Sequence, residues 1–296
     1  MNSPEKCGYV AIVGRPNVGK SSLLNRILGR KLSITSRKPQ TTRHQLLGIK
    51  TRDHVQTLYV DTPGLHKNSR KAINRYMNRA ASSVIKDVDV IIMVVDRMSW
   101  LEDDDVVLRH VMDGRVPVFL AINKVDLLDD KSRLLPYLEL AKTRMNFEEM
   151  IPISATNGHN VAELEKLLES HLPAGSHFFP ADQLTDRNER FLVAEIIREK
   201  ITRQLGDELP YEIAVQIDSY KNEDGTILID ATILVEREGQ KGILIGKQGA
   251  RLKKIGSEAR KDMESFLDSR ITLKLWVRVK SGWSDDDRAL VSLGYE

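Results

Sequence analysis

The sequence predicts an α/β fold with a doubly wound, mostly parallel sheet, followed by a smaller α+β unit. Up to residue 171, short β-branched and apolar runs alternate with stretches of helical periodicity. That alternation is typical of parallel strands joined by crossover helices. Residues 90–95 are continuously apolar, as expected for a strand buried on both faces. From residue 188 onward, two strands form a hairpin pattern and the helices are grouped, which indicates an α+β arrangement.

The expected strands of the first part are residues 9–13, 46–49, 57–60, 88–95, 116–122 and 150–153. The expected helices between them are residues 21–28, 72–85, 131–145 and 161–171.

In the second part, apolar residues spaced four apart between Val193 and Leu205 predict a helix. Two alternating runs joined by Asn-Glu-Asp-Gly at residues 222–225 predict a hairpin. The expected elements here are strands 211–220, 226–235 and 271–279, and helices 257–267 and 285–293.

Two domains are expected in a chain of 296 residues, because a domain has about 150 residues on average. We place the first domain at residues 8–171, a linker at 172–187, the second domain at 188–283, and a C-terminal helix and tail at 284–296. The linker assignment depends on two prolines and a glycine between residues 172 and 180.

The composition excludes several classes of protein. The chain has one cysteine, Cys7, so an intramolecular disulfide and a multi-cysteine zinc site are excluded. Its longest wholly apolar run has six residues, far fewer than the ~20 that span a bilayer. The N-terminus lacks the pattern of a secretory signal, so a cytoplasmic protein is expected. Residues 237–261 carry eight Lys and Arg against two Glu, although residues 176–296 have 19 basic and 22 acidic side chains.

A glycine-rich segment, residues 14–21, reads Gly-Arg-Pro-Asn-Val-Gly-Lys-Ser and matches G-x-x-x-x-G-K-[ST]. It follows an expected strand and opens an expected helix, which is the context of a phosphate-binding loop. Glycines let backbone N–H groups curl around phosphate oxygens, and the helix N-terminus adds partial positive charge. We expect Lys20 to reach the β- and γ-phosphates and Ser21 to ligate magnesium.

Residues 61–64 (Asp-Thr-Pro-Gly) follow the expected strand 57–60. A carboxylate at the end of that strand can hold magnesium, and the Gly64 amide can sense a γ-phosphate. The D-x-x-G pattern alone is common in turns. Together with the phosphate-binding loop, it predicts that Asp61 belongs to a magnesium site.

Asn123, Lys124 and Asp126 end the buried strand 116–122, at the edge where doubly wound sheets bind ligands. One carboxylate can accept both the N1–H and the 2-amino group of guanine, which adenine does not offer as donors. The stem of Lys124 is expected to cover the base and Asn123 to tie the loop. Taken alone, this motif fits a helix cap equally well. Residues 154–156 (Ser-Ala-Thr) could donate a backbone N–H to guanine O6.

The order of these motifs points to a function. A phosphate-binding loop, a threonine-containing loop, D-x-x-G, N-K-x-D and S-A-x follow one another along the chain. In this order, residues 8–171 resemble the GTPase superfamily, which has a Ras-like G domain of the P-loop NTPase class. The resemblance implies GTP and GDP as ligands, Mg²⁺ as cofactor, and hydrolysis of GTP to GDP and phosphate.

The residues expected to bind GTP are Gly14, Arg15, Pro16, Asn17, Val18, Gly19, Lys20, Ser21, Ser22, Asp61, Thr62, Pro63, Gly64, Leu65, Asn123, Lys124, Val125, Asp126, Ser154, Ala155 and Thr156. The expected magnesium ligands are Ser21, Thr42 and Asp61. Thr42 is chosen because it aligns with the threonine before Arg in similar bacterial GTPases; an ordinary loop residue is the alternative. The expected catalytic residues are Lys20, Thr42, Gly64 and Asn17.

Two positions bear on hydrolysis. Leu65 follows Gly64, where Ras-like GTPases carry a glutamine that orients water. Leucine can neither donate nor accept, so slow intrinsic turnover is expected. The sequence is similar to GTPases with a hydrophobic residue at this point, several of which use an asparagine like Asn17 to coordinate potassium. We therefore expect K⁺ at Asn17, with loop shaping as the alternative.

Residues 246–249 (Gly-Lys-Gln-Gly) lie between an apolar run and a basic, helical stretch. Glycines at both ends let the backbone approach nucleotide phosphates. In an α-β-β-α-α-β order, this segment resembles a type II KH domain; a helix–turn–helix with a solvated basic face is the alternative. The expected RNA-binding residues are Gly246, Lys247, Gln248, Gly249, Arg251, Lys253, Lys254, Lys280 and Trp283. Trp283 could stack on a base or pack against the final helix, and Trp276 stays unassigned.

A G domain followed by a type II KH domain resembles the Era-like family of bacterial ribosome-assembly GTPases over nearly the whole chain. The resemblance implies a monomer that binds the single-stranded 3′ end of 16S rRNA and acts in maturation of the 30S ribosomal subunit. It also implies peripheral association with the inner membrane. Two alternatives remain open: a constitutive RNA-binding adaptor whose nucleotide domain is structural, and a GTPase subunit of an RNA-modifying enzyme.

Overall fold

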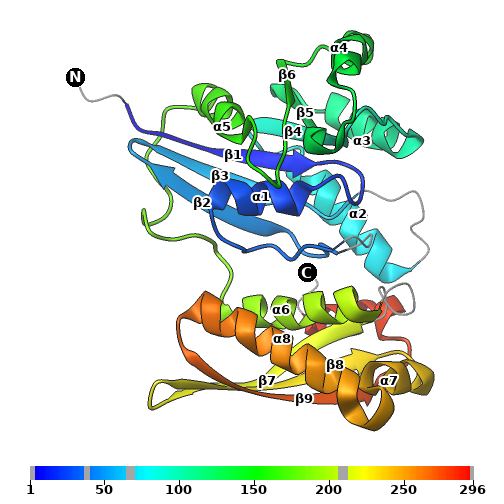
Figure 1. The fold of residues 1–296 in the computed structure, drawn as a ribbon. Coiled ribbons are helices and arrows are strands. Elements are labelled where there is room, and N and C mark those ends of the chain that lie inside the picture. Colours follow the sequence, from blue (N-terminus) through cyan, green and yellow to red (C-terminus); the bar gives the residue numbers. More distant parts are fainter. Residues whose placement is uncertain (1–3, 37–40, 65–70, 206–212, 294–296) are drawn as a thin grey trace. The chain divides into compact units, whose positions relative to one another are not determined.

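The computed structural model describes residues 4–36, 41–64, 71–205 and 213–293. The chain divides by contact into two compact units. The first comprises Met1–Ser33, Thr42–Ser69 and Met77–Asp186, and the second comprises Ile34–Thr41, Arg70–Tyr76 and Arg187–Glu296. The predicted fold class is confirmed: a mostly parallel sheet with helices on both faces in the first unit, and an α+β arrangement in the second (Figure 1).

The sheet of the first unit has six strands in the order β2-β3-β1-β4-β5-β6. They are β1 (Lys6–Val13), β2 (Leu46–Arg52), β3 (Val55–Asp61), β4 (Val90–Asp96), β5 (Val118–Asn123) and β6 (Glu149–Pro152). Only the β2–β3 pair is antiparallel among these neighbours. The carboxyl ends of the five parallel strands therefore meet at one edge, where the motif loops begin.

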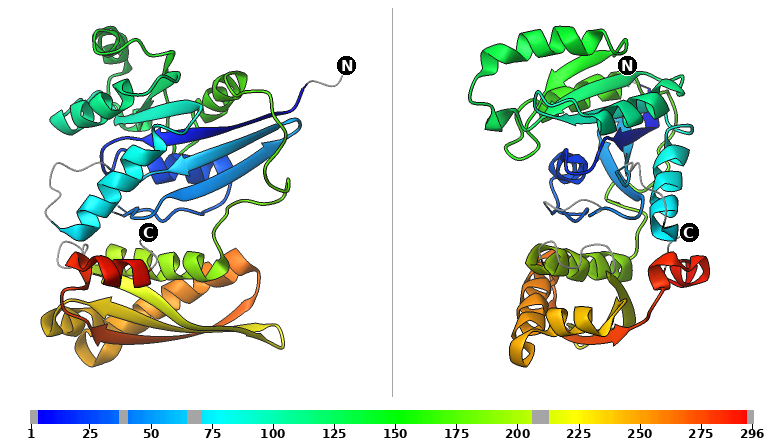
Figure 2. Two further views of the ribbon diagram at one scale, coloured as in Figure 1. Left: turned by 180° about the vertical axis from the view of Figure 1, so that it is seen from behind. Right: turned by 90° about the vertical axis from the view of Figure 1, so that its right-hand side faces the viewer.

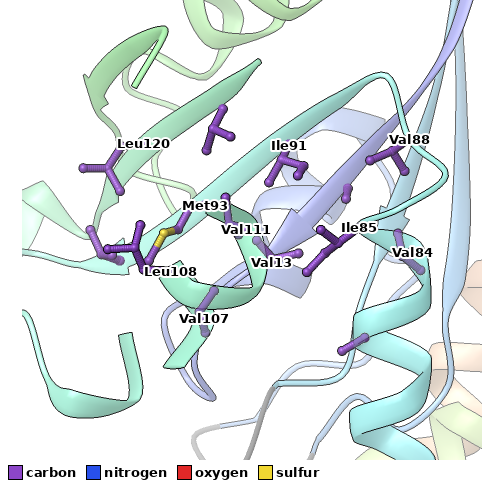
Figure 3. Close-up of a cluster of buried hydrophobic side chains, with 14 of the residues drawn as sticks. Val13, Val84, Ile85, Val88, Ile91, Met93, Val107, Leu108, Val111 and Leu120 are labelled. Atoms are coloured by element: carbon purple, nitrogen blue, oxygen red, sulfur yellow. The ribbon is translucent and has the colours of Figure 1, made fainter. Parts of the chain in front are cut away.

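The helices of this part are α1 (Lys20–Leu28), α2 (Ala72–Val84), α3 (Glu102–Met112), α4 (Leu134–Lys142) and α5 (Val161–Ser170). Of these, α3 was not among the expected helices. The core is built on β4, whose residues are all buried. Figure 3 shows Ile91 and Met93 of β4 packed with Val107 and Val111 of α3 and Leu120 of β5.

The stretch that the sequence predicts as a linker packs on the first unit as far as residue 186. The buried side chain of Gln56 accepts hydrogen bonds from the backbone N–H groups of Phe178 (2.8 Å) and Phe179 (3.0 Å). It also donates to the Phe179 carbonyl at 2.8 Å. Further along, the N–H of Ile49 donates to the carbonyl of Leu184 at 2.8 Å. The domain boundaries themselves stay a prediction.

The second unit has a three-stranded sheet, β7-β8-β9, with its three longest described helices on one face (Figures 1 and 2). Its elements are α6 (Glu189–Leu205), β7 (Ile213–Glu223), β8 (Thr226–Val235), α7 (Glu238–Ile245), α8 (Ala250–Leu267), β9 (Arg270–Val279) and α9 (Asp287–Ser292). The β7–β8 pair is antiparallel and the β8–β9 pair is parallel. Asp224 and Gly225 have φ values of 49° and 77°, which suit the type I′ turn that the hairpin needs.

Candidate functional site

The glycine-rich loop joins β1 to α1 at the carboxyl edge of the sheet (Figure 1). Gly14 has a φ of 154°, and a Cβ there would lie 2.5 Å from the carbonyl oxygen of Val94. Gly19 has a φ of 106°, and a Cβ there would lie 2.2 Å from the side-chain nitrogen of Asn123. Neither position admits a side chain, so packing as well as phosphate access requires these glycines. Asn17 between them is also left-handed, with a φ of 66°.

Lys20 is buried inside this loop. Its ammonium group donates to the carbonyl oxygens of Gly14 at 2.9 Å and Arg15 at 3.1 Å. Burial lowers the pKa of Lys20 to about 8, although the charge of Asp61 acts in the opposite direction. A cation held away from water gains more from an anionic partner than an exposed one does. The loop therefore presents a cation suited to a phosphate.

The three predicted magnesium ligands lie together. The Ser21 hydroxyl donates to Asp61 Oδ2 at 2.7 Å and is 2.7 Å from the hydroxyl oxygen of Thr42. Ser33, which the sequence did not single out, also donates to Asp61 Oδ2, at 2.8 Å. Burial raises the pKa of Asp61, against the opposing effects of Ser21, Lys20 and Ser33.

The second oxygen of Asp61 tests whether this group fits a metal. Oδ1 is buried and has no hydrogen-bond partner within the described part of the chain. A buried, unpartnered carboxylate oxygen beside two hydroxyls matches the oxygen ligands that Mg²⁺ prefers. Magnesium binding sites of this kind use few protein ligands and the phosphates of the substrate. The residues present therefore fit the ion.

Gly64 lies against the glycine-rich loop. A Cβ at Gly64 would lie 2.8 Å from Pro16 Cγ and 3.0 Å from the Pro16 nitrogen. The Thr62 hydroxyl donates to the carbonyl of Ile12 at 3.0 Å and ties this turn to β1. Gly64 thus lies next to the glycine-rich loop, as the predicted role of its amide at a γ-phosphate requires. Leu65 lies outside the described residues.

Asn123 connects the loops around the predicted guanine site. Its amide donates to the Val18 carbonyl at 2.8 Å, and its carbonyl accepts from the Ala155 N–H at 2.9 Å. Lys124, in the left-handed region at φ 65°, donates from Nζ to the Asn17 carbonyl and to Asp96, both at 2.7 Å. These contacts join the glycine-rich loop to the N-K-x-D and S-A-x loops.

A cavity of about 430 Å³ opens between the N-K-x-D loop and the loop that follows β6. Its lining residues are Val125, Asp126, Lys131, Ser154, Asn157, Gly158 and His159. The cavity places Asp126 and Ser154 at one concave site. The backbone carbonyls of Ala155 and Thr156 accept from the Arg26 guanidinium of α1, the first at 3.1 Å. The predicted residues Val18 and Asn123 are buried, and Ser22 lies in the first turn of α1.

Asp96 and Asp104 are structural partners of this site that the sequence reasoning missed. Burial acts to raise the pKa of Asp96, but hydrogen bonds from Lys124 and Arg97 hold that pKa below its usual range. Asp96 ends the buried strand β4, and a polar residue at that position was an available signal. Asp104 is buried and accepts from Arg15 Nε at 3.0 Å; burial raises its pKa.

The segment that precedes Thr42 belongs by contact to the second unit. The buried carboxylate of Glu199 in α6 accepts from the N–H of Thr35 at 3.0 Å. Arg203 donates to the Thr35 carbonyl at 3.1 Å. Arg198, also buried, donates to the carbonyl of Thr41. Side chains of α6 therefore bond to Thr35 and to Thr41, and Thr41 directly precedes the threonine at the magnesium site.

The predicted RNA loop connects α7 to α8. Gly246 and Gly249 have φ values of 72° and 76°, and Gln248 is also left-handed at 51°. A Cβ at Gly246 would lie 2.8 Å from the Cβ of Arg251. Arg251 is half-buried and donates to the carbonyl of Ile243 at 2.7 Å, which closes the end of α7.

The other predicted RNA contacts differ in exposure. Lys247, Lys253, Lys254 and Lys280 are exposed, as contact with phosphates requires. Trp283 is only 1% exposed and packs in a cluster with Ala72, Ile73, Ala214, Leu234, Ala289 and Leu290. The prediction that Trp283 stacks on a base is therefore wrong, and its alternative of packing against the final helix holds.

Comparison with known proteins gives matches to both units. Residues 9–124 match the family described as 50S ribosome-binding GTPase, and residues 208–284 match the KH domain family. The chain is 61% identical over 290 residues to the GTPase Era of Pseudomonas savastanoi pv. phaseolicola, covering 98% of this chain and 97% of that protein. It is 60% identical to the GTPase Era of Azotobacter vinelandii, with the same coverage.

Two solved structures are similar over the whole chain. A variant of Aquifex aeolicus Era bound to GDP.AlF4⁻ has a TM-score of 0.94 and 38% identity, covering 98% of this chain and 99% of that chain. A structure of Era with MgGDPNP and nucleotides 1506–1542 of 16S ribosomal RNA has a TM-score of 0.95, with the same identity and coverage.

Proposed function

Because the chain belongs to the family of Era GTPases, we propose that it binds the 3′ region of 16S ribosomal RNA through its second unit. We propose further that it acts in assembly of the small ribosomal subunit. Membership of the family makes it a GTPase, with GTP and GDP as its nucleotides. One observation carries the RNA proposal. The GTP-binding motifs and a Gly-Lys-Gln-Gly loop occur in one chain, and a relative that is similar over nearly the whole of both chains carries both ligands.

The chain's own residues account for nucleotide binding in physical terms. The glycine-rich loop surrounds the phosphates with N–H donors, and Lys20 neutralises part of their charge. Asp126 lies in the cavity where it can accept two donors of guanine. Magnesium, when bound, supplies positive charge to the phosphate oxygens, and Ser21, Thr42 and Asp61 would hold it.

Potassium at Asn17 belongs to the same proposal. The Asn17 carbonyl accepts from Lys124 at 2.7 Å, so a monovalent cation there would depend on the side-chain oxygen of Asn17. GTP turnover is measured in potassium and in sodium at equal ionic strength, for the natural chain and for Asn17→Ala. The natural chain should hydrolyse faster in potassium and the variant equally in both salts. Equal rates for the natural chain would remove this role.

We also propose that nucleotide state changes RNA affinity. Support comes from the hydrogen bonds that side chains of α6 make to Thr35 and Thr41. A shift of Thr42 onto magnesium must pass through Thr41, which precedes it in the chain. Helix α6 also packs against α8, to which Lys200 is linked by an ion pair with Asp262. An element bonded both to the sensing segment and to the RNA helix can bias each toward one of two states.

RNA crosslinking with sequencing, run with GTP, GDP and no nucleotide, tests target and coupling together. The expected result is crosslinks near the 3′ end of 16S rRNA whose yield depends on the nucleotide. A double change, Gly246→Asp with Gly249→Asp, should abolish these crosslinks and leave GDP affinity unchanged. The double change places side chains and negative charge at Gly246 and Gly249, whose φ values of 72° and 76° suit glycine. Crosslinks that survive this change would place the RNA clamp elsewhere.

The two alternatives give different results in the same experiment. Equal crosslinking in every nucleotide state would indicate a constitutive adaptor. Copurification with an RNA-modifying enzyme rather than with 30S subunits would indicate a subunit of that enzyme.

A cytoplasmic location, a monomeric state and peripheral association with the inner membrane are proposed from the family resemblance alone. Among the described helices, none is both long and apolar enough to cross a membrane. Sedimentation of the chain with vesicles of bacterial lipid tests the membrane association directly, and its failure to bind them would remove it.

A further inference from the structure

We infer that the outer face of β9 is a second RNA-contacting surface, separate from the Gly-Lys-Gln-Gly loop. It holds the phosphodiester backbone of a single-stranded segment and stacks a base on Trp276. The inference rests on the proposed RNA binding of the second unit and adds a site to it. We call this surface the β9 stripe; it consists of Arg270, Thr272, Lys274, Trp276, Arg278 and Lys280.

The alternation along β9 separates two faces. Ile271, Leu273 and Leu275 belong to the core of the second unit, and a Cβ at Gly256 of α8 would lie 3.3 Å from Leu275. The helices therefore cover the face that carries the odd-numbered residues. Successive side chains of a strand point to opposite faces, so the β9 stripe lies on the face away from α6 and α8. Every member of the stripe is exposed, Trp276 to 46%.

The cations of the stripe have no carboxylate partners among the described residues. Neither an ion pair nor a side-chain hydrogen bond involves Arg270, Lys274, Arg278 or Lys280. Elsewhere in this unit, buried cations are paired, as Lys200 is with Asp262. The nearest acid by strand register is Asp230, which lies opposite Lys274. The stripe is therefore a row of cations that form no ion pairs among the described residues, with Asp230 of the neighbouring strand as the acid beside it.

Positive charge on an edge strand has a second explanation, because charged side chains prevent strands of two molecules from pairing. Trp276 distinguishes the two explanations. A large exposed aromatic at the centre of the row would favour association of edges and would defeat that purpose. Aromatic side chains flanked by cations are the arrangement by which proteins bind single-stranded nucleic acid, since each base offers a face to stack and each phosphate a charge.

Helix α7 links the loop that the proposed function uses to the end of the β9 stripe at Lys280. Helix α7, which leads into Gly246, contacts β9, and the Lys280 N–H donates to the Val235 carbonyl at the end of the sheet where α7 begins. A KH loop clamps only about four nucleotides. Flanking nucleotides of a longer RNA can therefore reach the stripe, which from Arg270 to Arg278 spans about 26 Å at the rise of a strand.

The test compares a tetranucleotide with a single-stranded RNA of about 20 nucleotides, using the full chain and two variants, Trp276→Ala and Lys274→Ala with Arg278→Ala. Both variants should bind the tetranucleotide as the natural chain does. Trp276→Ala should bind the longer RNA about tenfold more weakly, in the range that loss of one stacked base produces. The lysine–arginine variant should lower the slope of log affinity against log salt by about 1.4, because each lost contact contributes about 0.7.

Two controls separate folding and location from binding. Trp276→Phe keeps an aromatic face and should retain most of the affinity for the longer RNA. Lys221→Ala removes an exposed lysine from β7, at the opposite edge of the same sheet, and should leave affinity and salt slope unchanged. Unchanged binding of the tetranucleotide shows that the second unit of each variant is folded, and unchanged GTP turnover shows the same for the first unit.

Three outcomes would overturn the inference. One is that both stripe variants bind the longer RNA with the same affinity and the same salt slope as the natural chain. Another is equal loss on the tetranucleotide and on the longer RNA, because this would make the stripe part of the loop site. A third is unchanged RNA binding with lost binding to anionic phospholipid vesicles, which would assign the stripe to a membrane. Failure of the natural chain to bind either RNA would refute the proposed function itself.

Discussion

Asn123→Ala should uncouple the loops of the nucleotide site. The Asn123 side chain is 2% exposed, and it bonds to the Val18 carbonyl at 2.8 Å and the Ala155 N–H at 2.9 Å. Alanine removes the side-chain amide and leaves the Val18 carbonyl and the Ala155 N–H without these hydrogen bonds. Each buried, unpaired group costs about 1–3 kcal/mol. Because an open cavity lined by Ser154 lies next to them, water can reach part of the gap, and a total of about 2–3 kcal/mol is expected.

This free energy should appear mainly in nucleotide affinity. If the two loops are ordered again only when nucleotide binds, about 2–3 kcal/mol of lost binding corresponds to a dissociation constant raised about 30- to 150-fold. Titration of a fluorescent GDP without magnesium measures it apart from the metal site.

A matched control is Gln56→Ala. Gln56 is an equally buried amide, bonded to backbone groups of Phe178 and Phe179 away from the cavity. Its loss should lower the free energy of unfolding and leave GDP affinity unchanged. An affinity of Asn123→Ala within threefold of the natural value would refute the reasoning, as would an equal loss of affinity in the control.

Asp126→Asn should shift preference from guanine toward xanthine nucleotides, because the side chain then offers one acceptor and one donor. Competition titrations with both nucleotides measure this preference. Unchanged GTP specificity would contradict the prediction. Since burial lowers the pKa of Lys20 to about 8 and bound phosphates favour the charged form, GDP binding should take up a proton above that pH. Affinity should fall up to about tenfold per pH unit, and calorimetry at pH 8.5 in buffers of different ionisation enthalpy should detect the uptake. In the nucleotide-free chain the unfolded state binds more protons between about 8 and 10.5, so Lys20 makes stability rise with pH in that window. Gly64→Ala would bring a Cβ within 2.8 Å of Pro16. The rate of GTP hydrolysis should therefore fall about 10²-fold, while GDP affinity is retained. A normal turnover rate would show that residues 61–64 can move aside.

Local patterns in the sequence were sufficient for much of the fold and site. The glycine-rich loop, Asp61 and Asn123 each follow an apolar run, and parallel pairing brings strand ends to one edge. The position of such residues follows from topology alone. For that reason the hydroxyl of Ser21 and the carboxylate of Asp61 could be placed together although 40 residues separate them.

Contacts that depend on side chains of irregular segments could not be predicted. Glu199 in α6 bonds to Thr35, 164 positions away, and neither residue belongs to a recognisable spacing. The sequence left two roles for Trp283, stacking on an RNA base and packing against the final helix, because a large aromatic side chain in a short tail suits both. Only the cluster that it joins, with Ile73 and Leu290, decides between them.

The packing of residues 173–185 determines where a separated nucleotide-binding fragment should end. Removing everything after residue 171 would strip Phe179 from the small apolar cluster of Cys7, Ile49 and Leu58 and would leave the amide of Gln56 facing solvent. A fragment that ends after residue 186 keeps this cover and its hydrogen bonds. Limited proteolysis of the whole chain should accordingly release a stable piece with its cut beyond that point, and a shorter piece should be prone to aggregate.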